Sequence, residues 1–173
     1  MPEKISIQTE LGEIIIELDT EHAPITATNF LRYVDDKRYD GATFYRVVRM
    51  DNQPDNDVKI EVIQGGLGMG EHPKKLPPIK QETTNITGLR HKDGTISMAR
   101  LAPDSAHSEF FICINDQPEL DFGGKRNPDG QGFAAFGQVT RGMDVVRKIQ
   151  QMATDKQALI KPVAIQNVRR VGK

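Results

Sequence analysis

The sequence predicts a mainly β protein in which an antiparallel β-barrel carries helices over its ends. Two observations lead to this fold class. About eight short runs of apolar and β-branched residues are separated by turn residues, and only two segments have apolar residues at helical spacing. The strands and helices do not alternate as they do in a β-α-β series, so a parallel sheet is not expected.

Length and charge limit the range of functions. The 173 residues suit one domain, which we expect to span residues 1–173. The formal net charge is -1, so no large positive field is available to hold a nucleic acid or an anionic membrane. No apolar run is long enough to span a bilayer, and the start of the chain lacks the basic and apolar regions of a signal peptide. We expect a cytoplasmic protein, or a periplasmic one if the chain is a mature form that has lost its signal peptide, with no nucleic-acid or membrane partner.

A hairpin and a helix are predicted at the start of the chain. The runs K-I-S-I-Q-T and E-I-I-I-E-L, residues 4–9 and 13–18, are separated by a turn at Gly12, which predicts two antiparallel strands. Pro24 suits the first turn of a helix. The residues after it include apolar side chains at roughly helical spacing, namely Ile25, Ala27, Phe30, Leu31 and Val34.

Strands and loops alternate through the middle of the chain. The runs T-F-Y-R-V-V (residues 43–48) and V-K-I-E-V-I-Q-G-G (residues 58–66) are predicted strands on either side of a polar insert, residues 50–57. Residues 65–93 are rich in Gly, Pro and Lys and have no steady period, so we expect an ordered excursion rather than a domain boundary. A strand then begins at T-I-S-M-A, residues 95–99.

The last third of the chain is predicted to contain three strands and one helix. The run E-F-F-I-C-I is a strand in which we expect Cys113 to be a small buried hydrophobe. A loop at residues 120–132 precedes the strand F-A-A-F-G-Q-V, and a helix is predicted from Gly142 to Gln151. The final strand is V-A-I-Q-N-V-R-R-V, residues 163–171.

A polar cluster between two predicted strands suggests hydrolase chemistry as an alternative. The cluster contains residue types that carry out acyl transfer, namely Asp104, Ser105, His107 and Ser108. However, the G-x-S-x-G motif is absent, and residues adjacent in sequence rarely point at one another. We therefore interpret these residues as turn formers.

Neither a metal nor a phosphate-bearing cofactor is predicted. The four histidines are scattered and none forms H-x-H or H-E-x-x-H, so we expect no metal site. The glycines of Q-G-G-L-G-M-G follow a strand as a phosphate loop would, but the next residues, E-H-P-K-K-L-P-P, cannot begin a helix. We expect a plain glycine-rich turn there.

Several short motifs occur in one order along nearly the whole chain. They are L-G-E-I-I-I-E-L-D, A-P-I-T-A-T-N-F, F-Y-R, Q-G-G, G-T-I-S-M-A-R, E-F-F-I and F-G-Q-V-T-R-G-M-D-V-V. In this order the chain resembles the cyclophilin family of peptidyl-prolyl cis-trans isomerases, and M-A-R with P-I-K-Q-E resembles its bacterial branch. The resemblance implies a closed eight-stranded antiparallel barrel capped by two α-helices. It also implies isomerisation of X-Pro bonds in peptides and unfolded protein chains, by a monomer that needs no cofactor and assists folding.

The resemblance further implies which residues form the proline-binding groove. Arg46 in F-Y-R matches the arginine that hydrogen-bonds to the prolyl nitrogen and favours the twisted amide over the planar one. Gln64 matches the glutamine that holds the substrate backbone, and Phe111 matches a wall of the proline pocket. The other substrate-binding positions implied in this way are Glu61, Val62, Ala99, Arg100, Glu109, Leu120 and Phe133.

Some of these positions depart from the family pattern. Glu61 and Val62 stand where the family has Phe and Met, and the insert at residues 50–57 could shift this register by one. Glu109 replaces a Gln, and its carboxylate could pair with Arg46 and compete with substrate. The sequence therefore leaves open an alternative function, a cyclophilin-like module that binds proline-containing peptides with weak or no catalysis.

Overall fold

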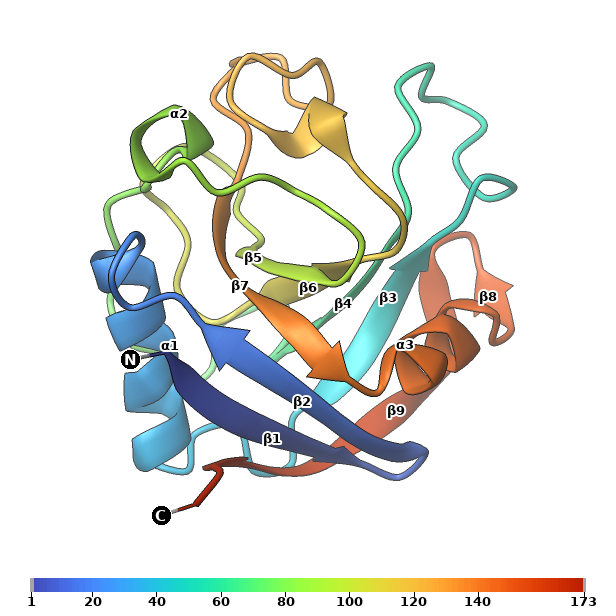
Figure 1. The fold of residues 1–173 in the computed structure, drawn as a ribbon. Helices are drawn as coiled ribbons and strands as arrows, with labels where there is room; N and C mark the ends of the chain where they lie inside the picture. The colour runs from blue at the N-terminus through green and yellow to red at the C-terminus, as the bar shows by residue number, and fades with distance from the viewer. Residues whose placement is uncertain (1, 173) are drawn as a thin grey trace.

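The computed structural model describes residues 2–172, and its strands form one antiparallel sheet (Figure 1). Within the described residues the sheet has nine strands, and neighbours follow the order β1-β2-β7-β5-β6-β4-β3-β9-β8. A further pairing of β1 with β9 closes eight of these strands into a barrel and leaves β8 outside. The predicted eight-stranded antiparallel barrel is confirmed. The strands are β1 (Glu3–Thr9), β2 (Gly12–Leu18), β3 (Thr43–Val48), β4 (Val62–Gly66), β5 (Thr95–Met98), β6 (Phe110–Cys113), β7 (Ala134–Arg141), β8 (Thr154–Asp155) and β9 (Ala158–Arg170).

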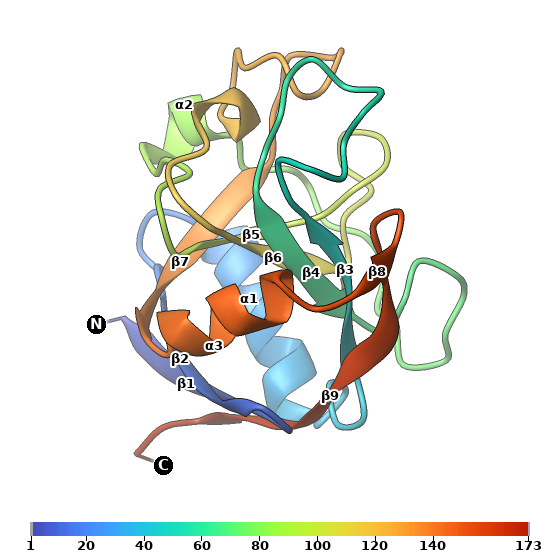
Figure 2. The ribbon, with the colours of Figure 1, turned by 90° about the vertical axis from the view of Figure 1, so that its right-hand side faces the viewer.

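Two helices lie over opposite ends of the barrel, as predicted (Figure 1 and Figure 2). They are α1 (Pro24–Asp35) and α3 (Met143–Gln150). Ile25 is 42% exposed, although it lies at roughly helical spacing with the buried Ala27. The polar side chain of Asn29 is buried on α1 instead, and its amide donates a 2.9 Å hydrogen bond to the backbone carbonyl of His107. The helix is therefore attached to the barrel by a buried polar contact that its apolar pattern does not reveal.

The connecting segments add two short helical turns, α2 (Thr84–Thr87) and the 3-10 helix η1 (Pro118–Leu120). In the part of the chain that the structure describes, every helix is too short or too polar to cross a bilayer.

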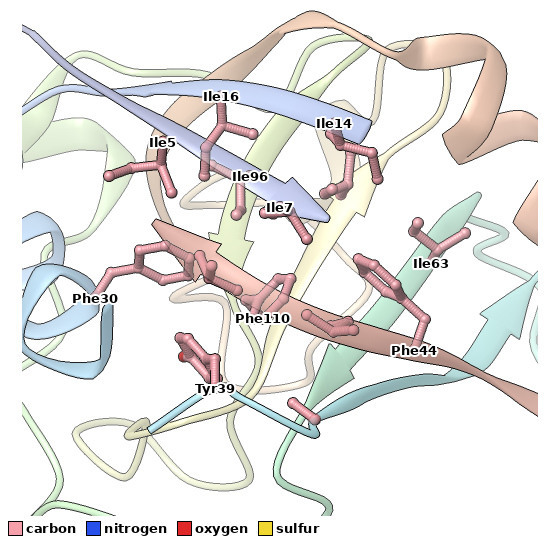
Figure 3. Packing of buried hydrophobic residues seen from close by; sticks show 14 of the residues in the cluster. Ile5, Ile7, Ile14, Ile16, Phe30, Tyr39, Phe44, Ile63, Ile96 and Phe110 are labelled. Atoms are coloured by element: carbon pink, nitrogen blue, oxygen red, sulfur yellow. The ribbon is translucent and has the colours of Figure 1, made fainter. Parts of the chain in front are cut away.

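The barrel interior is filled by aliphatic and aromatic side chains (Figure 3). Phe110 lies among three other rings and meets each of them edge to face, at centroid distances of 5.5–5.7 Å. Such ring pairs add about 0.5–1.5 kcal/mol each beyond the area that they bury. The three partners of Phe110 are Phe30 of α1, Tyr39 and Phe44 of β3, and the hairpin contributes the fully buried Ile5, Ile7, Ile14 and Ile16.

The predicted hairpin turns at Gly12, and this position requires glycine. Its φ is 136°, in the region that L-residues with side chains avoid. A Cβ atom there would also lie 2.9 Å from Cγ2 of Val145, which packs against the hairpin from α3. The turn and the packing of α3 against the hairpin therefore both require that residue 12 have no side chain.

A second apolar cluster lies on the outer wall of the barrel. Strands that also line the interior contribute alternate side chains to it, and the loops after β3 and β6 add two more. Its members are Val48, Val62, Phe111 and Cys113 of the strands and Ile60 and Leu120 of the loops, with Ala99 and Phe133 packed against them. Burial raises the pKa of the Cys113 thiol well above its usual value, which agrees with its predicted role as a buried hydrophobe. The long loops that follow β3 and β6 rise on one side of the barrel near this cluster (Figure 1 and Figure 2).

Strand β4 begins at Val62, later than the predicted start at residue 58. The reason is a side chain that takes the place of a neighbouring strand. Gln53 accepts a 3.1 Å hydrogen bond from the Ile60 N–H and donates one of 2.7 Å to the Ile60 carbonyl. The backbone N–H and carbonyl of Ile60 thus form their hydrogen bonds with a side chain of the insert at residues 50–57 rather than with a neighbouring strand.

Candidate functional site

A pocket of about 310 Å³ lies over the outer apolar cluster. The three residues predicted to be catalytic line it side by side, because they occupy one register row across adjacent strands. Arg46 of β3 is paired with Gln64 of β4, and Gln64 is paired with Phe111 of β6. Antiparallel pairing therefore brings together three residues that lie far apart in sequence.

A β-bulge at Tyr45 puts Arg46 on the outer face. The pairing of β3 with β4 shifts between Phe44 and Arg46, which leaves Tyr45 as an extra residue. Without this bulge, strict alternation would place Arg46 on the same face as Phe44, which is fully buried in the core. With it, the side chains of both Tyr45 and Arg46 reach Gln64.

Two glutamine side chains hold the guanidinium of Arg46. Its Nη1 donates to Oε1 of Gln64 at 2.8 Å, while Nη2 and Nε donate to Oε1 of Gln157 at 2.7 Å and 3.1 Å. Burial lowers the pKa of Arg46, but an arginine remains protonated in proteins. Both acceptors are neutral, so the side chain is oriented while its positive charge stays available to a ligand.

The floor of the pocket is apolar. It is formed by Val62, Phe111, Leu120 and Phe133, all of them predicted groove residues. The rings of Phe111 and Phe133 meet edge to face at 5.2 Å. Behind Phe111 the ring of His91 is stacked at 6.0 Å, so the wall is supported from the protein side.

His91 belongs to a buried Asp-His-Ser arrangement that sequence reasoning missed. Its Nδ1 lies 2.7 Å from Oδ1 of Asp121, and its Nε2 lies 2.8 Å from Oγ of Ser97. Ser97 is completely buried and His91 is 1% exposed, so no substrate can reach the hydroxyl. The arrangement holds the ring behind Phe111 and does not act as a nucleophile.

The polar cluster that suggested a hydrolase forms a loop, as the turn interpretation predicted. Asp104 has a φ of 62°, and its carboxylate accepts a 2.8 Å hydrogen bond from the Gln81 N–H. The Ser105 hydroxyl donates to the Ala102 carbonyl at 2.6 Å, and Ser108 is completely buried against Glu109. Neither hydroxyl is bonded to a histidine.

Ala99 and Arg100 form one edge of the pocket. The backbone N–H of Ala99 is already donated to the Glu109 carbonyl, at 3.0 Å. Arg100 makes a two-pronged ion pair with Asp129 at 2.9 Å and 3.0 Å, and its guanidinium lies 5.1 Å from the centre of the Phe133 ring. Arg100 therefore fastens the loop before β7 to the pocket wall, a contact not expected from the sequence.

Glu61 does not line the pocket, and this corrects the placement taken from the resemblance. Its carboxylate faces away, toward the amides of Asn115 at 3.0 Å and Gln150 at 3.2 Å. Ile60 lines the pocket instead. The pocket position that the resemblance gave to Glu61 is taken by the residue before it, because Gln53 of the insert holds the backbone of Ile60.

Glu109 does not line the pocket either, and it does not pair with Arg46. Its carboxylate is 5% exposed and accepts hydrogen bonds from the Tyr45 hydroxyl at 2.7 Å and the Gly68 N–H at 2.8 Å, with further bonds from Leu67 and Ser108. Burial, followed by the charge of Glu109, raises the pKa of Tyr45 well above its usual value, so the phenol keeps its proton. The carboxylate thus anchors the loop after β4.

Several lining residues, and Gln157, which holds Arg46 without lining the pocket itself, were not predicted from the sequence. Gln157 comes from the β8–β9 turn, where Lys156 has a φ of 58° without the Gly or Asn that would mark such a turn. Arg126 and Asn127 come from the loop before β7, where no motif of the sequence marks them as pocket residues. The remaining unpredicted lining residues are Ile60, Met69 and Leu101. Among residues 2–172 no group of three or more His, Cys, Asp or Glu side chains could hold a metal ion.

Comparisons with known proteins agree with the fold and identify the family. The family described as "Cyclophilin type peptidyl-prolyl cis-trans isomerase/CLD" matches residues 4–170. The chain is 36% identical to peptidyl-prolyl cis-trans isomerase cyp18 of Streptomyces antibioticus, over 97% of this chain and 98% of that protein. It is also 36% identical to peptidyl-prolyl cis-trans isomerase B of Escherichia coli, over 95% and 94% of the two chains. The crystal structure of a cyclophilin-type isomerase of Cryptosporidium parvum has the same fold, with a TM-score of 0.79 at 19% identity and coverage of 100% and 99%.

Proposed function

Because the chain belongs to the cyclophilin family and is a peptidyl-prolyl cis-trans isomerase, we propose that it acts at the pocket beside Arg46, with Arg46 as its catalytic residue. The observation that carries this proposal is the guanidinium held by two neutral glutamines at the rim of an apolar pocket. The names of the relatives do not favour the alternative of a binding module without catalysis.

The reaction requires only that a planar amide be twisted. Rotation about an X-Pro bond has a barrier of about 18–20 kcal/mol, because the amide loses its resonance on the way. In the twisted state the prolyl nitrogen regains a lone pair, and a hydrogen bond from the Arg46 guanidinium stabilises that state more than the planar one. Gln64 and Gln157 contribute by holding the guanidinium in place before the substrate arrives.

The apolar floor and the strand edge supply binding. We propose that the proline ring packs on the floor of Val62, Phe111, Leu120 and Phe133, which is free of polar side chains. The substrate backbone would lie along the edge formed by Ala99 and Arg100, with Gln64 opposite. The substrates are proline-containing peptides and unfolded protein chains.

The organisation of the protein in the cell is part of the same proposal. Residues 1–173 act as a single domain, which is supported by a family match that spans residues 4–170. The protein works as a monomer. The near balance of charges, with a net charge of -1, supports a function without nucleic-acid or membrane partners. The protein works in the cytoplasm, or in the periplasm if it is a mature form.

Substitution of Arg46 tests the catalytic assignment. Arg46→Ala should lower kcat/KM by about tenfold to a hundredfold, the range expected for loss of a charged hydrogen bond in the transition state. Arg46→Lys should not restore the rate, since an ammonium cannot reproduce the planar set of donors. Arg147→Ala removes an arginine that is half exposed on α3 and is the matched control. Circular dichroism should show an intact barrel in all three variants, and a fully active Arg46→Ala protein would refute the assignment.

A further inference from the structure

A second guanidinium enters the same pocket from the loop before β7. Arg126 lines the pocket together with Arg46. Its Nη1 donates to Oε1 of Gln53 at 2.8 Å and to the backbone carbonyl of Val58 at 2.6 Å. Gln53 is itself fixed by its two hydrogen bonds to Ile60, so Arg126 is oriented by the insert at residues 50–57 and by the residue that follows it.

The positive charge of Arg126 has no carboxylate partner. Its two acceptors are neutral, and within the described residues no acidic side chain lies within ion-pair distance of it. The described lining of the pocket contains three arginines and neither Asp nor Glu, and of the three only Arg100 is neutralised, by Asp129. Arg46 and Arg126 line the same pocket, and the pKa of Arg126 is lowered by burial and, to a smaller extent, by the charge of Arg46.

A donor next to Arg126 in sequence lacks an acceptor. Asn127 lines the same pocket, and its Nδ2 is buried without a hydrogen-bond partner among residues 2–172. An unpartnered buried donor is costly, as is a pair of partly buried like charges. A bound carboxylate would relieve both, because its two oxygens accept hydrogen bonds and its charge balances the guanidinium.

We propose that Arg126 and Asn127 form a carboxylate subsite, which makes the isomerase selective for substrates with an acidic residue next to the proline. This specificity rests on the proposed function, since it requires that the proline bind in the pocket beside Arg46. The apolar floor recognises the proline ring, and the loop before β7 adds recognition of the neighbouring side chain.

Matched peptides test the proposal. The substrates are short peptides with blocked ends that carry Glu, Gln or Lys immediately before or immediately after a single proline, and turnover is measured by NMR exchange spectroscopy. In one of the two positions the wild-type kcat/KM should favour Glu over Gln by about fivefold, the size of a favourable ion pair at a partly exposed site. Lys should be turned over more slowly than Gln. The preference should fall below about twofold at about 1 M salt, where the screening length is about 3 Å.

Variants assign the preference to the subsite. Arg126→Gln should bring the Glu to Gln ratio close to one, Arg126→Lys should keep most of the preference, and Asn127→Ala should reduce it. Lys125→Gln removes the same charge from an exposed neighbour that does not line the pocket, and it should leave the ratio unchanged. If Arg126→Gln fails to fold, the Asn127→Ala protein provides the test in its place, because the subsite predicts a reduced preference in that variant.

Two results would overturn the subsite. One is equal turnover of the Glu and Gln peptides by the wild type in both positions, and the other is a preference that survives in Arg126→Gln. The catalytic assignment fails in a different way, through normal turnover of the Gln peptide by Arg46→Ala. The ratio between peptides and the absolute rate therefore report on the two proposals separately.

Discussion

The hydroxyl of Tyr45 donates a 2.7 Å hydrogen bond to the carboxylate of Glu109. The same phenol oxygen accepts a 3.0 Å bond from the amide of Gln64, and the carbonyl of that amide holds Arg46. A chain of hydrogen bonds thus links a buried carboxylate to the proposed catalytic guanidinium. Glu109 orients the site from behind and does not compete with the substrate for Arg46.

Substitution Glu109→Gln should destabilise the protein without raising its turnover. The carboxylate accepts bonds from four donors, and an amide would present N–H groups to some of them. The loss should be about 1–3 kcal/mol in the free energy of unfolding, as for a buried donor left unpaired. Urea denaturation measures it, and Glu119→Gln is the control because Glu119 accepts only one backbone bond, from Lys125. Faster isomerisation with unchanged stability would instead mean that Glu109 restrains Arg46.

Substitution Tyr45→Phe should reduce kcat more than it changes KM. Without the phenol oxygen the Gln64 amide is free to rotate, so the orientation of Arg46 is lost while the apolar floor remains. A fall in kcat of about fivefold corresponds to one hydrogen bond of about 1 kcal/mol. The control is Tyr33→Phe, which removes another buried hydroxyl, one that accepts the Leu76 N–H, and should lower stability alone. If the two variants behave alike in steady-state kinetics, Tyr45 has only a structural role.

A negative charge at residue 157 should lower the rate of isomerisation. Gln157→Leu removes two hydrogen bonds from Arg46 but leaves its charge, whereas Gln157→Glu places a carboxylate about where Oε1 now lies, 2.7 Å from Nη2. In the Glu variant the carboxylate would form an ion pair with Arg46 and compete with the substrate for the guanidinium. Its kcat/KM should therefore be about tenfold or more below that of the wild type, and also below that of the Leu variant. Gln138→Glu, on the exposed side of β7, adds the same charge elsewhere and should have no effect. A Gln157→Glu enzyme faster than Gln157→Leu would contradict this role of the glutamine.

The hydrogen bond between Asp121 and His91, whose ring is stacked behind Phe111, should make the free energy of unfolding depend on pH in the acid range. Burial alone would raise the pKa of Asp121, but hydrogen bonds from the His91 side chain and backbone outweigh burial and lower it. The folded pKa therefore lies below the unfolded value of about 3.9, so this stabilisation is complete above about pH 4 and is lost as the pH falls through the folded value.

Asp121→Asn should remove that dependence. At pH 7 the variant should be less stable by about 1–3 kcal/mol, because a hydrogen bond to a charged group is lost. The difference from wild type should narrow below about pH 4, where the unfolded chain takes up a proton at this carboxylate before the folded protein does. Urea denaturation at pH 7, 5 and 3 checks this, with the exposed Asp116→Asn as control. A difference that stays constant over this range would exclude Asp121 as the titrating group.

Local pattern in the sequence determined most of the fold. The alternating isoleucines of the first two strands, a proline at the start of α1 and a glycine where the hairpin turns each act over a few residues, so they can be interpreted without the rest of the chain. The order of short motifs pointed to the barrel and to Arg46, Gln64 and Phe111. The family and the isomerase activity follow from that order.

Tertiary structure alone decided how these residues are used. The bulge at Tyr45 moves Arg46 to the outer face, the insert displaces Glu61 in favour of Ile60, and Glu109 bonds with Tyr45 rather than Arg46. Contacts made by the loops bring Gln157 and Arg126 to the pocket. Their placement could not be predicted because each depends on hydrogen bonds between segments that are distant in sequence, and a local apolar pattern carries no information about which buried polar group will find which partner.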